Sequence, residues 1–274
     1  MNNNIIAIMY DFDKTLCTKD MQEYTFIPNL EIEPSVFWNK ATNLRIKDHM
    51  DSVLSYMYVM KNEMQKQNKN LTKTYLKKMG KNIELFPGVE EWFDRINEYG
   101  KKYGITIEHY IISSGLKEII EGSPIGNKFK CIFASEFYYD KNKNAVWPKL
   151  AINYTNKTQY LIRINKGALD TSDDYNINKK LNEGEKRIEI SSMIYIGDGI
   201  TDVPCMKLTK EAGGTSIAVY TNNNMNIAKE LKKDERINYI VPADYTNNSQ
   251  IDIIVKKTIE SISVKKQLRD LSKN

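Results

Sequence analysis

The sequence predicts an α/β fold, with a doubly wound, mainly parallel sheet and a long helical insert after the first strand. Two observations lead to this prediction. Several short β-rich apolar runs are separated by longer segments with helical spacing, which is the pattern of parallel strands joined by helices. The segment after the first run, by contrast, has helical spacing throughout. Ligands of such sheets bind at the carboxyl ends of the strands, so the residues that follow each strand are the first candidates for function.

The first strand is predicted at residues 5–10, a nearly unbroken apolar run. It ends at two carboxylates, Asp11 and Asp13, whose spacing lets both project beyond the strand end in the same direction. Thr15 follows two residues later. Two neighbouring carboxylates repel each other, and a divalent cation or a shared proton relieves that repulsion. An Asp-x-Asp pair can also cap a turn into the next helix, so this segment alone leaves both interpretations open.

The insert is predicted to cover residues 16–87. Apolar residues recur there at helical spacing, in the set Ile46, Met50, Val53, Leu54, Met57, Met60, Met64, Leu71, Tyr75, Leu76 and Met79. We expect this Met-rich stripe to pack inside the insert rather than to bind a partner. Pro87-Gly88 ends the insert, and an amphipathic helix is predicted after it.

The later elements are predicted from the same signals. Aromatic residues around an Asp-Lys-Asn-Lys-Asn turn predict a β-hairpin extension over 136–156. Residues 158–165 are expected to be helical, the polar segment 170–187 to be a loop, and residues 252–271 to form a terminal helix. The remaining strands are predicted at 105–112, 131–135, 192–196, 216–220 and 239–242.

Three further motifs follow these elements. Ser113-Ser114-Gly115 ends the second strand, Lys157 opens a helix, and Gly197-Asp198-Gly199-Ile200-Thr201-Asp202 ends a later strand. Together with the acidic pair, this order resembles the haloacid dehalogenase (HAD) superfamily of phosphotransferases and phosphatases. The resemblance covers residues 1–15 and about 88–245, and it is loosely closest to the phosphoserine-phosphatase-like branch. It implies a Rossmann-like core of residues 1–15 and 88–274. It also implies that residues 16–87 form a mobile cap, with hinges at 16–20 and 85–88.

The carboxylates suit phosphoryl transfer, which needs positioning and charge neutralisation. Asp11 is placed to attack phosphorus and form an aspartyl-phosphate, and Asp13 can protonate the leaving alcohol and then deprotonate water. Asp198 is the third oxygen donor and, with Asp11 and waters, makes an octahedral site suited to Mg²⁺. The resemblance implies the same roles, and it adds that the backbone carbonyl of Asp13 binds the metal. Thr15 is expected to fix the loop through side-chain hydrogen bonds.

Backbone and hydroxyl groups are predicted to hold the phosphate. Ser113 can donate its hydroxyl, while Ser114 and Gly115 offer backbone N–H groups at the start of the following helix. Gly197 and Gly199 are expected to let the backbone approach closely, because they lack a Cβ.

Lys157 is predicted to offset the charge of the carboxylates. Its rival is Lys166, which closes the same helix, where a lysine is ordinary, and we therefore favour Lys157. Asp202 either binds metal-bound water, holds Lys157, or is only an acidic residue near a helix start.

Composition agrees with a soluble enzyme. The chain has 274 residues, 41% of them hydrophobic, and a net charge of +5 from 40 basic and 35 acidic residues, which is too mixed to imply nucleic acid. Its cysteines lack metal-ligand spacing and indicate a reduced, intracellular protein. No apolar run is long enough for a membrane helix, and the amino terminus lacks a charged signal-peptide start. A cytoplasmic protein with no membrane association is expected.

We therefore expect Mg²⁺-dependent hydrolysis of a small phosphorylated metabolite through Asp11. The alternatives are a phosphotransferase or mutase of the same superfamily, and a non-catalytic phospholigand-binding protein, against which the intact motif residues argue. A nucleic-acid 3′-phosphatase would need a basic groove with aromatic side chains, which the hairpin aromatics allow but do not require. The sequence does not identify the substrate; the candidate cap residues are Asp20, Glu23, Tyr24, Arg45 and Lys47.

Overall fold

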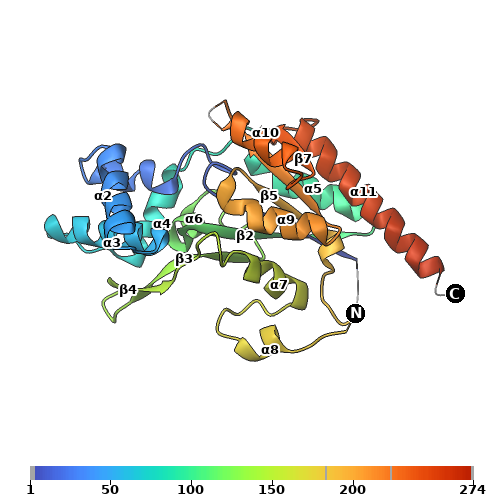
Figure 1. Cartoon of the computed structure of the whole chain (residues 1–274), viewed down its shortest axis with the longest axis horizontal. Helices are drawn as coiled ribbons and strands as arrows, with labels where there is room; N and C mark the ends of the chain where they lie inside the picture. The colour runs from blue at the N-terminus through green and yellow to red at the C-terminus, as the bar shows by residue number, and fades with distance from the viewer. Residues whose placement is uncertain (1–3, 183, 223, 273–274) are drawn as a thin grey trace.

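The computed structural model describes residues 4–182, 184–222 and 224–272. Its described part contains a seven-stranded sheet with the order β4-β3-β2-β1-β5-β6-β7 (Figure 1). Neighbouring strands are parallel, except that β4 runs antiparallel to β3. The strands are β1 Ile5–Tyr10, β2 Thr106–Leu116, β3 Cys131–Tyr139, β4 Ala145–Leu150, β5 Met193–Gly197, β6 Thr215–Tyr220 and β7 Tyr239–Pro242. The predicted α/β fold is confirmed.

The helices divide into those before β2 and those after it. The first group is α1 Phe26–Asn29, α2 Pro34–Lys47, α3 Ser52–Lys66, α4 Lys73–Met79 and α5 Val89–Lys102. The second group is α6 Lys117–Gly122, α7 Thr158–Lys166, α8 Asp174–Asn178, α9 Val203–Glu211, α10 Met225–Lys233 and α11 Gln250–Leu271. None of the helices in the described ranges is both long and apolar enough to cross a lipid bilayer.

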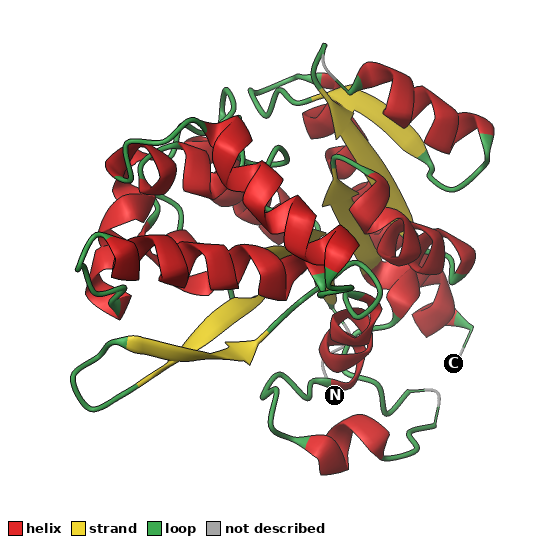
Figure 2. Cartoon of the chain, turned by 60° about the vertical axis from the view of Figure 1, so that its left-hand side comes forward, coloured by secondary structure: helices red, strands yellow, loops and turns green. Residues whose placement is uncertain are grey.

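Alternate residues of β1 face two different apolar layers. Ile8 and Tyr10 belong to the layer that contains α5 and α11, whereas Met9 belongs to the layer that contains α7 and α9. Helices therefore cover both faces of the sheet, as Figures 1 and 2 show. β1 is the central strand. The strands β2 to β4 follow on one side of it and the strands β5 to β7 on the other. The residues after β1 and β5 therefore lie at the switch point where α/β sheets bind ligands.

Two strands are longer than the sequence predicts. β3 runs without interruption into the predicted hairpin and pairs with β4, which Figure 2 shows extending beyond the neighbouring helices. β2 continues to Leu116, with an irregular register between Ile112 and Leu116. The predicted polar loop 170–187 is wrong in part, because it contains α8. Asp173 begins this helix by accepting a hydrogen bond from the Asn176 N–H at 2.9 Å.

The segment between β1 and α5 contains α1 to α4. Met57, Met60 and Met64 of α3 are buried, so this part of the Met-rich stripe packs inside the protein. Ile46 is 62% exposed, because α2 ends at Lys47 and the chain turns before α3 begins. The periodic pattern therefore spans α2, α3 and α4, and it holds in α3 and in α4, where Leu76 and Met79 are also buried.

The same segment contacts the sheet domain at several points. Its two ends run side by side, since the Thr18 N–H donates to the Glu84 carbonyl at 3.1 Å and the Phe86 N–H to the Leu16 carbonyl at 3.0 Å. α4 packs closely on α6: a Cβ added at Gly122 would lie 1.9 Å from the Lys77 carbonyl oxygen. This approach requires glycine, because any larger residue would push the two helices apart.

Candidate active site

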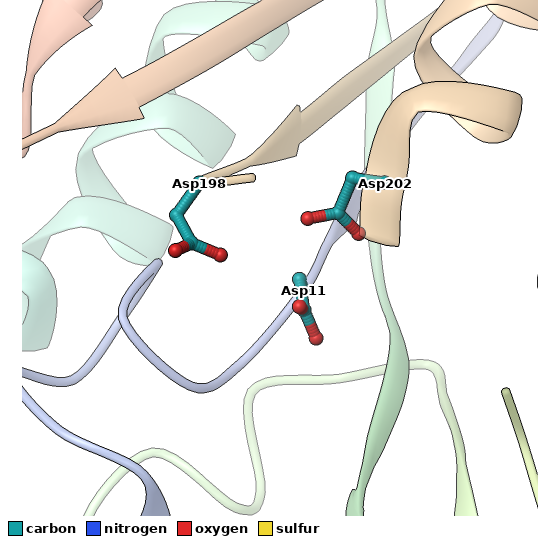
Figure 3. A group of neighbouring side chains, drawn as sticks. All are labelled: Asp11, Asp198 and Asp202. Carbon is teal, nitrogen blue, oxygen red and sulfur yellow. The ribbon is translucent and has the colours of Figure 1, made fainter. Parts of the chain in front are cut away.

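Three carboxylates from distant parts of the sequence meet at the carboxyl ends of β1 and β5. Asp11 follows β1, Asp198 follows β5, and Asp202 begins α9 (Figure 3). One oxygen of each lies within 4.8 Å of the others. Figure 3 shows the three side chains pointing into a common space. The sheet order explains the cluster, because β1 and β5 are hydrogen-bonded neighbours.

Lys157 joins two of these carboxylates. Its Nζ lies 3.1 Å from Asp11 Oδ2 and 2.8 Å from Asp202 Oδ1, and its side chain is fully buried. The Tyr195 hydroxyl donates to the same Asp202 oxygen at 2.8 Å. Lys166 lies elsewhere: its Nζ donates to the carbonyls of residues 177 and 179, at the end of α8 and just beyond it. Lys157 is therefore the lysine that reaches the carboxylate cluster.

Burial and mutual repulsion shift the pKa values of the cluster. Burial raises the pKa of Asp11 to about 6, although the Lys157 charge opposes the shift. Burial and the charges of Asp202 and Asp11 raise the pKa of Asp198 to about 8. Burial by itself would lower the pKa of Lys157, but the charges of Asp11 and Asp202 outweigh it and raise that pKa. The cluster holds more negative charge than one lysine compensates.

The donor set fits a hard divalent cation such as Mg²⁺. Asp202 Oδ2 is buried and has no hydrogen-bond partner, which is costly for a carboxylate oxygen unless a ligand compensates it. Carboxylate oxygens, with few of them per site, are the ligands that Mg²⁺ prefers. Gly197 permits the close approach, because a Cβ there would lie 2.5 Å from Asp202 Oδ2. A Cβ at Gly199 would contact nothing within 4 Å, so no protein group requires a glycine there.

Asp13 lies beside this cluster, and a backbone amide of the insert holds its side chain. Its Oδ1 accepts a hydrogen bond from the Met21 N–H at 2.9 Å. Burial, together with the charges of Asp20 and Asp11, raises the pKa of Asp13 well above its ordinary value. A carboxyl with a raised pKa is better suited to general acid catalysis than an ordinary carboxyl.

The segment predicted to bind phosphate lies at the end of β2. Ser113 Oγ accepts a hydrogen bond from the Gly115 N–H at 3.1 Å and can still donate its own hydrogen. The Ser114 carbonyl accepts from the Tyr56 hydroxyl of α3 at 2.6 Å. The expectation that Ser114 and Gly115 lie at a helix start is wrong. They belong to the end of β2, and α6 begins only at Lys117.

Thr15 acts differently from its expected role. Its Oγ1 is buried without a hydrogen-bond partner. The loop is held instead through the Thr15 carbonyl, which accepts from the Tyr245 hydroxyl at 2.8 Å.

The candidate cap residues are mostly engaged with other protein groups. Asp20 pairs with Lys14 at 2.6 Å, and Glu23 accepts a hydrogen bond from the Trp38 indole at 2.7 Å. The Tyr24 hydroxyl accepts from the Lys19 N–H at 2.7 Å. Two other candidates, Arg45 and Lys47, are exposed near the end of α2.

Three contacts of the site escaped the sequence analysis. Tyr195 lies two residues before Gly197, and in the sequence a tyrosine at this position indicates only a buried strand. Asn224 follows β6 and donates to the Asp198 carbonyl at 3.0 Å, so the strand-end rule applied to β6 would have identified it. Met21 carries no chemical signal of its own, and only the fold reveals its place.

The sequence is similar to those of known proteins. Residues 8–207 match the family described as haloacid dehalogenase-like hydrolase. An uncharacterised protein of Borreliella burgdorferi is 28% identical over 280 residues, which cover 90% of this chain and 94% of that protein.

Solved structures share the fold. A HAD family hydrolase, t0658, from Salmonella enterica serovar Typhi has a TM-score of 0.59 at 18% identity, covering 92% of this chain and 70% of that one. A phospho-aspartyl intermediate analogue of phosphoserine phosphatase has a TM-score of 0.56 at 17% identity, covering 93% of this chain and 99% of that one. At these identities the likeness concerns the fold alone.

Proposed function

This chain belongs to the haloacid dehalogenase-like hydrolases, and on that premise we propose that it hydrolyses a small phosphomonoester through Asp11, with Mg²⁺ as cofactor. The observation that carries the proposal is the position of Lys157 between Asp11 and Asp202, beside the third carboxylate Asp198. A buried cation next to a carboxylate nucleophile offsets the charge that a phosphoryl group brings.

Asp11 is the proposed nucleophile. Its Oδ1 accepts the Phe12 N–H at 2.7 Å and its Oδ2 pairs with Lys157, so both hydrogen bonds fix the orientation of the carboxylate. Attack on phosphorus forms an aspartyl-phosphate and releases the alcohol, and water then hydrolyses this acyl phosphate. The raised pKa of Asp13 suits it to protonate the leaving oxygen, after which the carboxylate can take a proton from water.

Asp11, Asp198 and the Asp13 carbonyl would hold Mg²⁺, with Asp202 oriented toward it. When bound, Mg²⁺ neutralises charge on the phosphoryl oxygens and favours the ionised form of the carboxylates. Ser113 is proposed to donate its hydroxyl to a phosphoryl oxygen, together with the backbone N–H groups of Ser114 and Gly115. The Gly115 N–H would then exchange its hydrogen bond to Ser113 Oγ for one to the phosphate.

The proposed substrate is a small phosphorylated metabolite. Glu23 would have suited an amine-bearing substrate, but its Oε1 is engaged by the Trp38 indole. Asp20 is likewise paired with Lys14. These contacts favour a substrate that does not depend on either carboxylate for recognition. A phosphotransferase would use the same residues with an organic acceptor in place of water.

The proposal is tested by phosphatase assays on a panel of phosphomonoesters, with and without Mg²⁺. Asp11→Asn keeps the shape of the side chain and removes the nucleophile, so turnover should fall to background. Asp234→Asn, a change at an exposed carboxylate in another part of the fold, should leave turnover unchanged. Mass spectrometry after a rapid quench should detect a phosphoryl adduct on Asp11. Turnover that persists in Asp11→Asn, or that is independent of divalent metal, would reject the mechanism.

A further inference from the structure

The Met21 side chain occupies the edge of the candidate site. Its Sδ accepts a hydrogen bond from the Leu116 N–H at 3.1 Å, and the residue is only 1% exposed. A Cβ added at Gly115 would lie 2.1 Å from Met21 Cε, so the methyl group rests directly on the Gly115 backbone. A side chain from the insert thus lies on the strand end that is proposed to bind phosphate.

The same residue contacts the proposed general acid. The Met21 N–H donates to Asp13 Oδ1, which leaves Oδ2 as the oxygen available to a leaving group. The added Cβ at Gly115 would also lie 3.1 Å from Asp13 Oδ2, which places this oxygen and the Met21 methyl on the same side of Gly115. A leaving alcohol must come within hydrogen-bond reach of Asp13, and Met21 borders that space.

Neighbouring contacts hold the segment that carries Met21. Asp20, the residue before Met21, forms an ion pair with Lys14. The Tyr24 hydroxyl accepts a hydrogen bond from the Lys19 N–H across the turn that contains Met21. The Tyr24 hydroxyl also donates to the Glu84 carbonyl at 3.2 Å. Met21 is therefore positioned by both ends of the insert.

We propose that Met21 determines specificity by filling the leaving-group side of the site, so that phosphomonoesters with a small leaving group are preferred over bulky ones. This inference rests on the proposed function, because it assigns the leaving-group side through Asp13. Methionine is unbranched and flexible, so the limit is a graded preference and not an absolute block. Each methylene that a pocket accepts or rejects changes specificity about 10- to 200-fold.

The test compares ethyl phosphate with 1-naphthyl phosphate in the wild type and in Met21→Ala. The two alcohols differ in leaving ability, but this difference cancels when the ratio of their kcat/KM values is compared between proteins. Met21→Ala should raise the naphthyl-to-ethyl ratio at least tenfold. Met21→Leu, with similar volume, should keep the ratio near that of the wild type. Met60→Ala, which shortens a buried methionine of α3 outside the site, controls for a loosened insert.

A binding experiment separates this inference from the proposed function. Calorimetry with ethylphosphonate and 1-naphthylmethylphosphonate in the presence of Mg²⁺ needs no turnover. If the wild type binds ethylphosphonate but hydrolyses no ester, the proposed function is rejected. The ratio of the two phosphonate affinities then still tests the role of Met21. An unchanged affinity ratio in Met21→Ala, an equal change in Met60→Ala, or no binding of either phosphonate would overturn the proposal for Met21.

Discussion

The Lys157 ammonium lies 2.8 Å from Asp202 Oδ1, and neither side chain is exposed to solvent. The same ammonium lies 3.1 Å from Asp11 Oδ2. A buried cation that bridges two carboxylates contributes little net stability when intact, because all three groups lose their hydration. Removal of the cation is costly, because it leaves two anions buried without compensation.

Lys157→Met should therefore destabilise the protein and slow turnover. The free energy of unfolding should fall by roughly 3–5 kcal/mol, measured by urea denaturation without metal. The loss of the positive charge should lower kcat by about 10²- to 10³-fold. A variant that keeps wild-type kcat would contradict the placement of Lys157 in the site.

Lys166→Met is the matched control on the same helix. Its ammonium donates to two backbone carbonyls at the end of α8, away from the carboxylate cluster, so kcat should be unchanged. The segment around α8 should become more sensitive to limited proteolysis, because these hydrogen bonds hold it against α7.

The two glycines of the last motif should respond differently to alanine. Gly197→Ala would bring a Cβ to 2.5 Å from Asp202 Oδ2, and relief of this clash should cost about 1–3 kcal/mol in stability. It should also weaken Mg²⁺ binding, because Asp202 must move. Gly199→Ala meets nothing within 4 Å and has extended backbone, so its stability should stay within about 0.5 kcal/mol of the wild type. Equal losses in the two variants would contradict this account.

Much of the fold could be predicted because β-rich runs and helical spacing are local signals. The strand before Asp11 and the hairpin around β4 were found in this way. The polar segment that contains α8 was missed, because its helix is short and none of its residues is buried. Its stability comes from Lys166 and Arg163, which bind the carbonyls of the segment from α7. Such long-range contacts leave no periodic pattern in the sequence.

The candidate site was likewise predictable only where local signals mark its residues. Strand ends identified Asp11 and Asp198, since the sheet order brings these positions together. The position of Met21 could not be predicted, because it depends on how the insert folds back over Gly115. The same role was predicted for Gly197 and Gly199, yet a Cβ would meet Asp202 at Gly197 and nothing within 4 Å at Gly199.

Without metal, the contribution of Asp198 and Asp11 to the stability of the protein should decrease as pH rises. The pKa of Asp198 is raised to about 8 and that of Asp11 to about 6, both above the value of about 4 expected in the unfolded chain. The folded state therefore favours the protonated carboxyls. Their stabilising contribution is full below about pH 4 and is lost as pH rises through 6 and 8. Thermal unfolding in the presence of a chelator, measured between pH 4 and pH 9, tests this.

The Mg²⁺ ion that we propose for this site should reverse this trend, because a bound cation favours the ionised carboxylates. The gain in Tm on addition of Mg²⁺ should be larger at pH 8 than at pH 5. Asp198→Asn should flatten the pH dependence of the metal-free protein and reduce the Mg²⁺ effect, whereas Asp234→Asn should change neither. A metal-free Asp198→Asn variant with the same pH dependence as the wild type would contradict the direction of these shifts.

The packing of α4 on α6 should resist any motion that lifts α4 away from the sheet domain. A Cβ at Gly122 would lie 1.9 Å from the Lys77 carbonyl oxygen, which is backbone and cannot rotate aside. Gly122→Ala should therefore destabilise the protein by about 1–3 kcal/mol, measured by urea denaturation. It should also speed hydrogen exchange of the amides in α4 and α6 together, because the two helices share the contact.

Lys77→Ala is the control for this contact, because it removes a side chain and keeps the backbone approach. The Lys77 ammonium pairs with Glu121 at 2.7 Å, but the lysine side chain is 45% exposed, so the loss should be at most about 1 kcal/mol. If Gly122→Ala costs no more than Lys77→Ala, the two helices do not depend on the close backbone approach. A larger loss in Gly122→Ala, with joint exchange of both helices, would mean that α4 stays with the sheet domain. Any opening of residues 16–87 would then be confined to the parts of the insert outside α4.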